Sequence, residues 1–115
     1  MSLRIQKVNE LIKRELGKIL LKEFDISKNI LLTITRVETT GNLIESKVFI
    51  SVIPEKETRE ILKLINKKIY NLQQILNKKL HIRPVPKIKF VEDKQLKQAL
   101  EIEEILGKES KKIVE

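Results

Sequence analysis

The chain has 115 residues, 41% of them hydrophobic and 35% charged, and its formal net charge is +8. This length suits one domain with a single hydrophobic core, and the low content of Gly and Pro, three of each, excludes collagen-like and low-complexity chains. Cysteine is absent, which excludes disulfide bonds, a thiolate nucleophile and a cysteine-based zinc site.

An amphipathic helix and a β-hairpin are predicted in the first half of the chain. Over residues 4–24, apolar side chains recur at spacings of three and four, which indicates a helix with one buried face. Residues 31–39 are rich in β-branched side chains, and residues 44–53 alternate between apolar and polar side chains. The short "TGN" at residues 40–42 is typical of a turn, so the two segments are expected to pair.

A second long helix is predicted over residues 58–80. Its isoleucine and leucine side chains share one arc of a helical wheel, and several lysines fall on the opposite side. Lys68 is the exception, because on a straight helix it falls within the apolar arc. This predicts either that the Lys68 side chain snorkels to solvent or that the helix kinks near residues 68–70.

The stretch "HIRPVPKIKF", residues 81–90, alternates like a strand although it contains two prolines. Pro84 and Pro86 have the same parity, so they remove backbone donors from one side of the strand only, which is typical of a sheet edge. Lys87 and Lys89 are expected to point away from the apolar side chains. An edge position also offers these lysines a structural role, because charge there discourages pairing with other sheets.

The element order is therefore α-β-β-α-β, with one more helix at the C-terminus. Asp93 is expected to cap that last helix and Gly107 to end it. A hairpin followed by a helical crossover to a third strand gives an α+β fold with a three-stranded sheet and helices on one face. We expect a single domain over residues 1–106, followed by a flexible tail over residues 107–115.

The positive charge is concentrated in the third quarter of the chain. Residues 61–91 contain eight Lys and Arg residues and no Asp or Glu. A solvated helix usually mixes both signs, because opposite charges one turn apart stabilise it. The segment is therefore predicted to form one continuous cationic surface that binds a polyanion. Its candidate RNA-binding residues are Lys63, Lys67, Lys68, Lys78, Lys79, Arg83, Lys87 and Lys89.

The sequence offers little for catalysis. His81 is the only histidine, so a hydrolase would depend on this residue alone, and we interpret it as an ordinary strand residue. The glycines form no phosphate-binding loop. We therefore expect no enzyme, no catalytic residues, and no metal or cofactor.

No apolar run approaches the roughly 20 residues of a membrane span, and the N-terminal residues lack the apolar region of a signal peptide, which predicts a cytoplasmic protein.

Aromatic residues are scarce, with three Phe, one Tyr and no Trp. Phe24, Phe49 and Phe90 lie on or beside apolar periods and are predicted to be core positions. Tyr70 is the only aromatic residue left for base stacking. Binding is therefore expected mainly through phosphates and through the shape of structured RNA.

Several stretches of the chain resemble one known family. The order α-β-β-α-β is similar to the type II KH fold, although no glycine between Gly41 and Gly107 can form the GxxG loop of RNA-binding KH domains. The stretches "VNELIKREL", "ITRVETTGNLIESKVFISV", "NKKLHIRPVPKIKFVED" and "IEEIL" resemble bacterial ribosome-binding factor A. The third is the most specific, because its Pro, Phe and Asp hold fixed positions across a strand and a cap. Where the family has an Ala-x-Gly kink in its second long helix, this chain has "KIY" at residues 68–70.

This resemblance implies a non-catalytic assembly factor for the small ribosomal subunit. It implies binding to the immature subunit and its ribosomal RNA, help with late maturation and rRNA processing, and a role in growth in the cold. We expect a monomer that contacts no membrane. Charge alone leaves an alternative open, namely a basic protein-interaction module or a membrane-surface domain that meets an acidic partner or anionic lipid.

Overall fold

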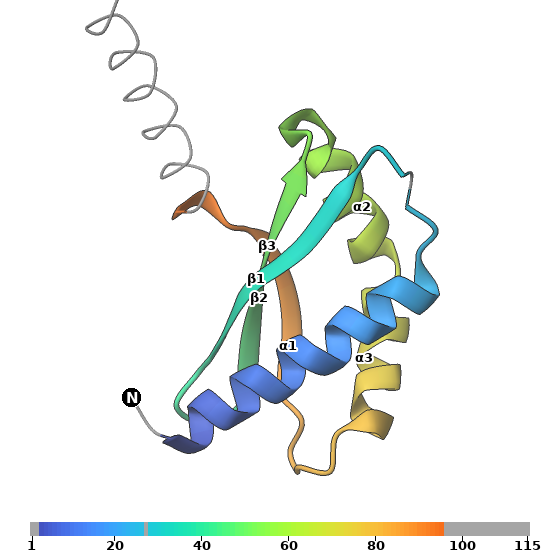
Figure 1. Cartoon of the computed structure of the whole chain (residues 1–115). Coiled ribbons are helices and arrows are strands. Elements are labelled where there is room, and N and C mark those ends of the chain that lie inside the picture. The colour runs from blue at the N-terminus through green and yellow to red at the C-terminus, as the bar shows by residue number, and fades with distance from the viewer. Residues whose placement is uncertain (1–2, 27, 96–115) are drawn as a thin grey trace, which may run out of the picture.

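The computed structural model describes residues 3–26 and 28–95, which form a three-stranded sheet covered on one face by helices (Figure 1). The elements in chain order are α1 (Leu3–Glu23), β1 (Leu31–Thr39), β2 (Glu45–Ile53), a short 3-10 helix (Glu55–Glu57), α2 (Thr58–Lys67), α3 (Ile69–Lys79) and β3 (Lys87–Glu92). The predicted α+β class and the predicted order of helices and strands are confirmed. The predicted C-terminal helix and the tail lie outside the described residues.

The central strand of the sheet is β2. It pairs antiparallel with β1 and parallel with β3, in registers that place Thr39 opposite Ser46 and Lys47 opposite Lys89. A parallel neighbour requires a crossover connection, and the helices α2 and α3 provide it. As predicted, β3 is therefore an edge strand.

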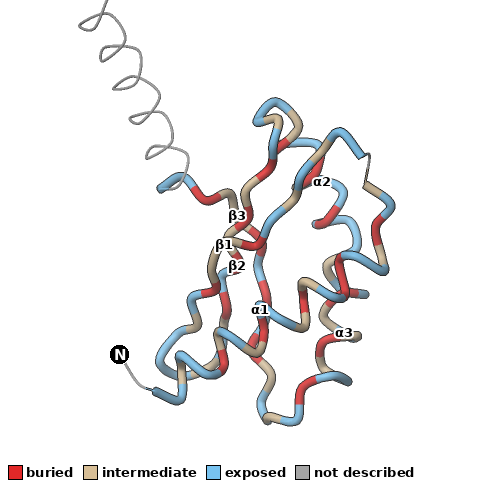
Figure 2. The backbone as a smooth tube through the Cα atoms, viewed as in Figure 1, coloured by how far each residue is buried: buried red, intermediate tan, exposed pale blue. Residues whose placement is uncertain are grey.

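The hydrophobic core lies between the sheet and the helices. Buried positions recur along α1, α3 and the inner side of the strands (Figure 2). In α1 they follow the spacing of three and four that predicted this helix. The fully enclosed apolar side chains include Ile12, Leu16, Val48, Ile50, Ile65, Leu72, Leu76, Leu80 and Pro86.

Of the three phenylalanines, two are core residues as predicted and one is not. Phe24 and Phe90 are buried, whereas Phe49 is half-buried on the open face of the sheet. Successive side chains of a strand point to opposite faces, so the burial of Val48 places Phe49 outside the core. The guanidinium of Arg36 covers the Phe49 ring at 4.0 Å from the ring centre.

The second long helix is interrupted at Lys68, which is one of the two alternatives that the position of this lysine left open. α2 ends at Lys67 and α3 begins at Ile69, and Lys68 has backbone angles of φ −108° and ψ 14°. Its N–H donates to the carbonyl of Ile65 at 3.0 Å, three residues back, so the last turn of α2 is tightened. The change of phase releases the Lys68 side chain from the core, and its ammonium lies 5.4 Å from the centre of the Phe24 ring.

The third strand starts later than predicted. β3 begins at Lys87, and residues 80–86 form a connection that includes both prolines and His81, which is exposed there and is not a strand residue. Proline has no N–H to donate to a strand ladder, so the alternating pattern of residues 81–86 does not continue the strand. The end of this connection is held instead by a side chain of α3.

That side chain is Gln73, which links α3 to the start of β3. Its Oε1 accepts the N–H of Ile88 at 2.8 Å, and its Nε2 donates to the carbonyl of Pro86 at 3.1 Å. The same Nε2 also donates to Asn77 at 3.0 Å. Gln73 therefore satisfies edge-strand groups that have no strand partner on that side.

We expect Gln73→Leu to lower the free energy of unfolding by about 1–3 kcal/mol, because it leaves the Ile88 N–H and the Pro86 carbonyl without their partner. Urea denaturation of both proteins measures this difference. The matched control is Gln74→Leu, at an exposed position, which should stay within about 0.5 kcal/mol of the wild type. Equal midpoints for the two variants would contradict the role assigned to Gln73.

Asp93 anchors the end of the described chain to the sheet. The residue is buried, and its carboxylate accepts the hydroxyl of Thr35 at 2.5 Å and lies 3.8 Å from the Arg36 guanidinium. The sequence indicated Asp93 only as a helix cap, and the helix concerned lies outside the described residues. The contact with Thr35 joins residues 58 positions apart in the chain, which no local pattern predicts.

Candidate nucleic-acid interface

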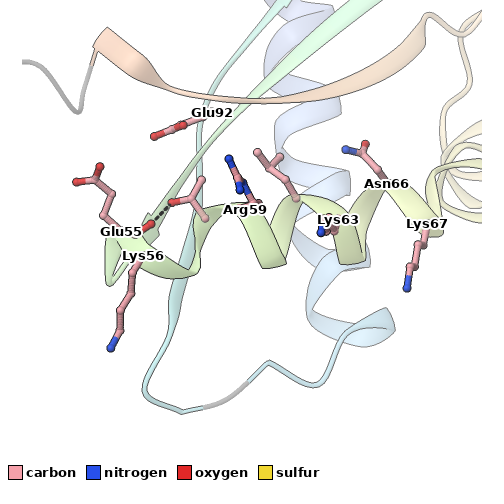
Figure 3. A pocket seen from close by; sticks show the side chains of 9 residues that line it. Glu55, Lys56, Arg59, Lys63, Asn66, Lys67 and Glu92 are labelled. Atoms are coloured by element: carbon pink, nitrogen blue, oxygen red, sulfur yellow. Dashed lines mark hydrogen bonds between the residues drawn. The ribbon is translucent and has the colours of Figure 1, made fainter.

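A basic hollow lies beside α2, at the edge of the sheet formed by β3 (Figure 3). Its volume is about 1010 Å³. Four cations and two carboxylates contribute to its lining, so the charge of the hollow is positive. The lining residues are Glu55, Lys56, Thr58, Arg59, Leu62, Lys63, Asn66, Lys67 and Glu92.

Helical spacing brings three of these cations together. Arg59, Lys63 and Lys67 follow one another at intervals of four residues, which places them along one side of α2. We call these three residues the basic stripe. The opposite side of the helix is fixed against the core by Ile61 and Ile65, so the stripe faces solvent. Figure 3 shows Arg59 reaching from α2 toward β3, while Lys67 extends away from that strand.

Lys63 and Lys67 of this stripe were identified from the sequence, whereas Arg59 was missed. Lys56, which lines the hollow outside the stripe, was also missed. Both missed residues precede the acid-free segment, in a stretch that also contains Glu55, Glu57 and Glu60. The spacing of four from Arg59 to Lys63 to Lys67 is the signal that could have found Arg59.

A second group of cations lies on the open face of the sheet. Lys87 and Lys89 are exposed, and Ile88 and Phe90 between and after them are buried, which confirms the predicted alternation of β3. Lys89 lies directly opposite Lys47 of β2, and like charges in such a position destabilise a sheet. The sequence did not indicate Lys47. Side chains near Lys89 on this face line a smaller hollow, and they include Arg36, Lys47 and Lys94.

The remaining predicted residues lie elsewhere. Lys78 and Lys79 are exposed in the last turn of α3. Lys68 covers the Phe24 ring, and the guanidinium of Arg83 donates to the carbonyls of Leu80 and Ile82 at 3.0 and 2.7 Å. The eight predicted cations are thus divided among α2, the break after it at Lys68, the end of α3, the connection to β3 and the open face of the sheet. The predicted single continuous surface is wrong in this respect, because the two faces of β3 separate its lysines from those of the helices.

All eight predicted cations are nevertheless exposed and free of ion pairs with described carboxylates. The ion pairs found within residues 3–26 and 28–95 involve Arg14, Lys18 and Arg36. A surface of unpaired Lys and Arg can neutralise phosphates without first breaking internal salt bridges.

The described residues show neither a group of metal ligands nor a membrane-spanning helix. Within residues 3–26 and 28–95 no three His, Asp or Glu side chains are grouped so that they could hold a metal ion. None of the helices in this part of the chain combines the length and the apolar character needed to cross a bilayer.

The fold and this surface define a small KH-like α+β protein with exposed, unpaired basic side chains. A family model described as Ribosome-binding factor A matches residues 4–106. The chain belongs to the ribosome-binding factor A family, as the sequence resemblance indicated.

Relatives from two bacteria match almost the whole chain. A ribosome-binding factor A of Chlorobium phaeobacteroides is 37% identical over 109 residues, which are 92% of this chain and 93% of the relative. One of Coxiella burnetii is 32% identical over 112 residues, which are 97% of this chain and 94% of the relative.

Solved structures share the fold at lower identity. The crystal structure of ribosome-binding factor A from Thermus thermophilus matches with a TM-score of 0.65 at 19% identity, over 76% of this chain and 93% of that one. A homology model of the Thermus thermophilus protein, fitted into the cryo-EM map of its complex with 30S, matches with a TM-score of 0.61 at 19% identity, over 72% of this chain and 88% of that one.

Proposed function

We propose that this protein binds the immature small ribosomal subunit through its ribosomal RNA and assists late maturation, including rRNA processing and growth in the cold. Its family membership supports ribosome binding, and the fold neighbour fitted into a 30S complex supports the small subunit as the partner. We further propose that it acts in the cytoplasm as a monomer and without catalysis.

The observation that carries this proposal is the exposed basic stripe. Arg59, Lys63 and Lys67 lie one turn apart along α2 and have no ion-pair partner among the described residues. Contacts of Lys and Arg with phosphates provide much of a protein's affinity for RNA. These contacts do not depend on the identity of the bases. The stripe and the lysines at the end of α3 and on β3 thus suit a structured RNA that contacts more than one side of the molecule.

The experiment that tests the proposal is pelleting of the purified protein with immature small subunits, with large subunits as the control. We expect half of the protein to pellet at a lower concentration of small subunits than of large subunits. A parallel flotation with anionic liposomes tests the membrane alternative. Equal pelleting with both subunits, or flotation in preference to pelleting, would contradict the proposal.

The association is expected to weaken steeply with salt. If six of the exposed cations contact phosphates, the logarithm of the association constant should fall against the logarithm of the salt concentration with a slope of about −4 to −5, because each contact releases a counterion. Pelleting over a series of KCl concentrations measures this slope. A constant that does not change with salt would rule out binding through phosphates.

A further inference from the structure

Tyr70 is an exposed aromatic residue without a structural role in the described chain. Its side chain is 76% exposed in the first turn of α3, and its hydroxyl makes no hydrogen bond to a described residue. The described phenylalanines, in contrast, are buried or covered by Arg36. Covering an exposed ring with another flat apolar surface lowers the free energy, because apolar area is removed from water.

The neighbours of Tyr70 indicate what that surface is. Asn66 and Lys67, which line the basic hollow, precede it by four and three residues across the interruption at Lys68, and Gln74 follows it by one turn of α3. All three are exposed, and none carries negative charge. An apolar protein pocket would have to accept a rim of cations and amides, whereas a nucleotide offers a flat base together with a phosphate that suits these side chains.

We infer that Tyr70 stacks on an unpaired base of the RNA whose phosphates the basic stripe holds, an inference that rests on the function proposed above. In a duplex the bases are stacked on one another and their faces are covered, so only a loop, bulge or single strand can present one to Tyr70. Stacking on an aromatic ring tolerates any base, because every base has a π face. The substrate class is therefore structured RNA with an unpaired nucleotide beside the phosphates that contact α2.

The composition of the chain provides a specific probe of this contact. Tyr70 is the only tyrosine and tryptophan is absent, so the tyrosine emission of the protein reports Tyr70 alone. The emission is measured during titration with a single-stranded RNA of about 12 nucleotides, within the usual site size of single-strand binders. We expect quenching by the single strand. A duplex RNA with the same number of phosphates should bind with much less quenching.

Variants separate stacking from phosphate binding. Tyr70→Ala should lower the affinity for the single strand about tenfold, whereas Tyr70→Phe, which keeps the ring, should stay within about twofold. The salt slope of Tyr70→Ala should equal that of the wild type, because no phosphate contact is lost. The duplex affinity should not change. Thermal unfolding of each variant checks that the exposed substitution leaves the fold intact.

The outcomes distinguish this inference from the proposed function. If Tyr70→Ala binds the single strand as tightly as the wild type, or if the duplex quenches the emission as strongly as the single strand, Tyr70 does not stack and the inference is overturned. If the wild type binds neither RNA but still pellets with small subunits, only the inference is overturned. If it also fails to pellet with small subunits, the proposed function is contradicted as well. Tenfold weaker binding of Tyr70→Ala at an unchanged salt slope supports both.

Discussion

Reversing the basic stripe with the substitutions Arg59→Glu, Lys63→Glu and Lys67→Glu is expected to lower the affinity for small subunits by about a hundredfold or more. Each charge-assisted contact to a phosphate contributes about 1 kcal/mol or more, and three lost contacts correspond to at least about two orders of magnitude. The new carboxylates also repel the RNA. The three side chains are exposed and carry no ion pair with described residues, so the fold should be retained.

A matched control reverses Lys7 and Lys22 of α1 and Lys28 after it, three exposed lysines that have no ion-pair partner among the described residues. It changes the net charge by the same amount outside α2. Pelleting with small subunits should then be reduced far less than by reversal of the basic stripe. An equal loss in both variants would mean that overall charge, and not the α2 surface, determines binding.

The substitution Leu76→Ala is expected to have the largest effect on stability. Leu76 is fully enclosed in the core and is one of two buried residues that hold α3 against it. Removal of a buried leucine side chain costs about 2–5 kcal/mol through lost burial and the cavity left behind. A domain of this size has about 5–15 kcal/mol of total stability, so the variant should melt at a much lower temperature.

Leu64→Ala is the control for this prediction, because Leu64 is a leucine of α2 that is 39% exposed. Its removal should lower the free energy of unfolding by less than about 1 kcal/mol. Urea denaturation compares the two variants directly. Similar destabilisation of both would contradict the assignment of Leu76 to the core.

Patterns that extend over several turns made much of the fold predictable. The first helix and the hairpin lie within about one residue of their predicted limits, because periodicity and turn chemistry are local properties. The misfit of Lys68 in the apolar arc left two outcomes open, a snorkelling side chain or a kink, and the structure shows the interruption. In these elements the hydrophobic period and the turn residues agree with the observed helix and hairpin.

Features that depend on distant partners were not predictable. The start of β3 depends on Gln73 of α3 and on pairing with β2, while the alternation in the sequence begins six residues earlier. The contacts of Asp93 with Thr35 and Arg36 likewise bring distant residues together. For the site, the charges were evident in the sequence, but their division between two faces followed only from the position of β3 beside β2.

Comparison of salt slopes tests most directly whether the cations of α2 contact phosphates. The association constant with small subunits is measured over a series of salt concentrations for the wild type and for a variant with Arg59→Gln, Lys63→Gln and Lys67→Gln. We predict a slope that is smaller in magnitude by about 2–3 in the variant, because each lost phosphate contact removes nearly one released counterion. An identical slope in the two proteins would show that the basic stripe does not touch the RNA.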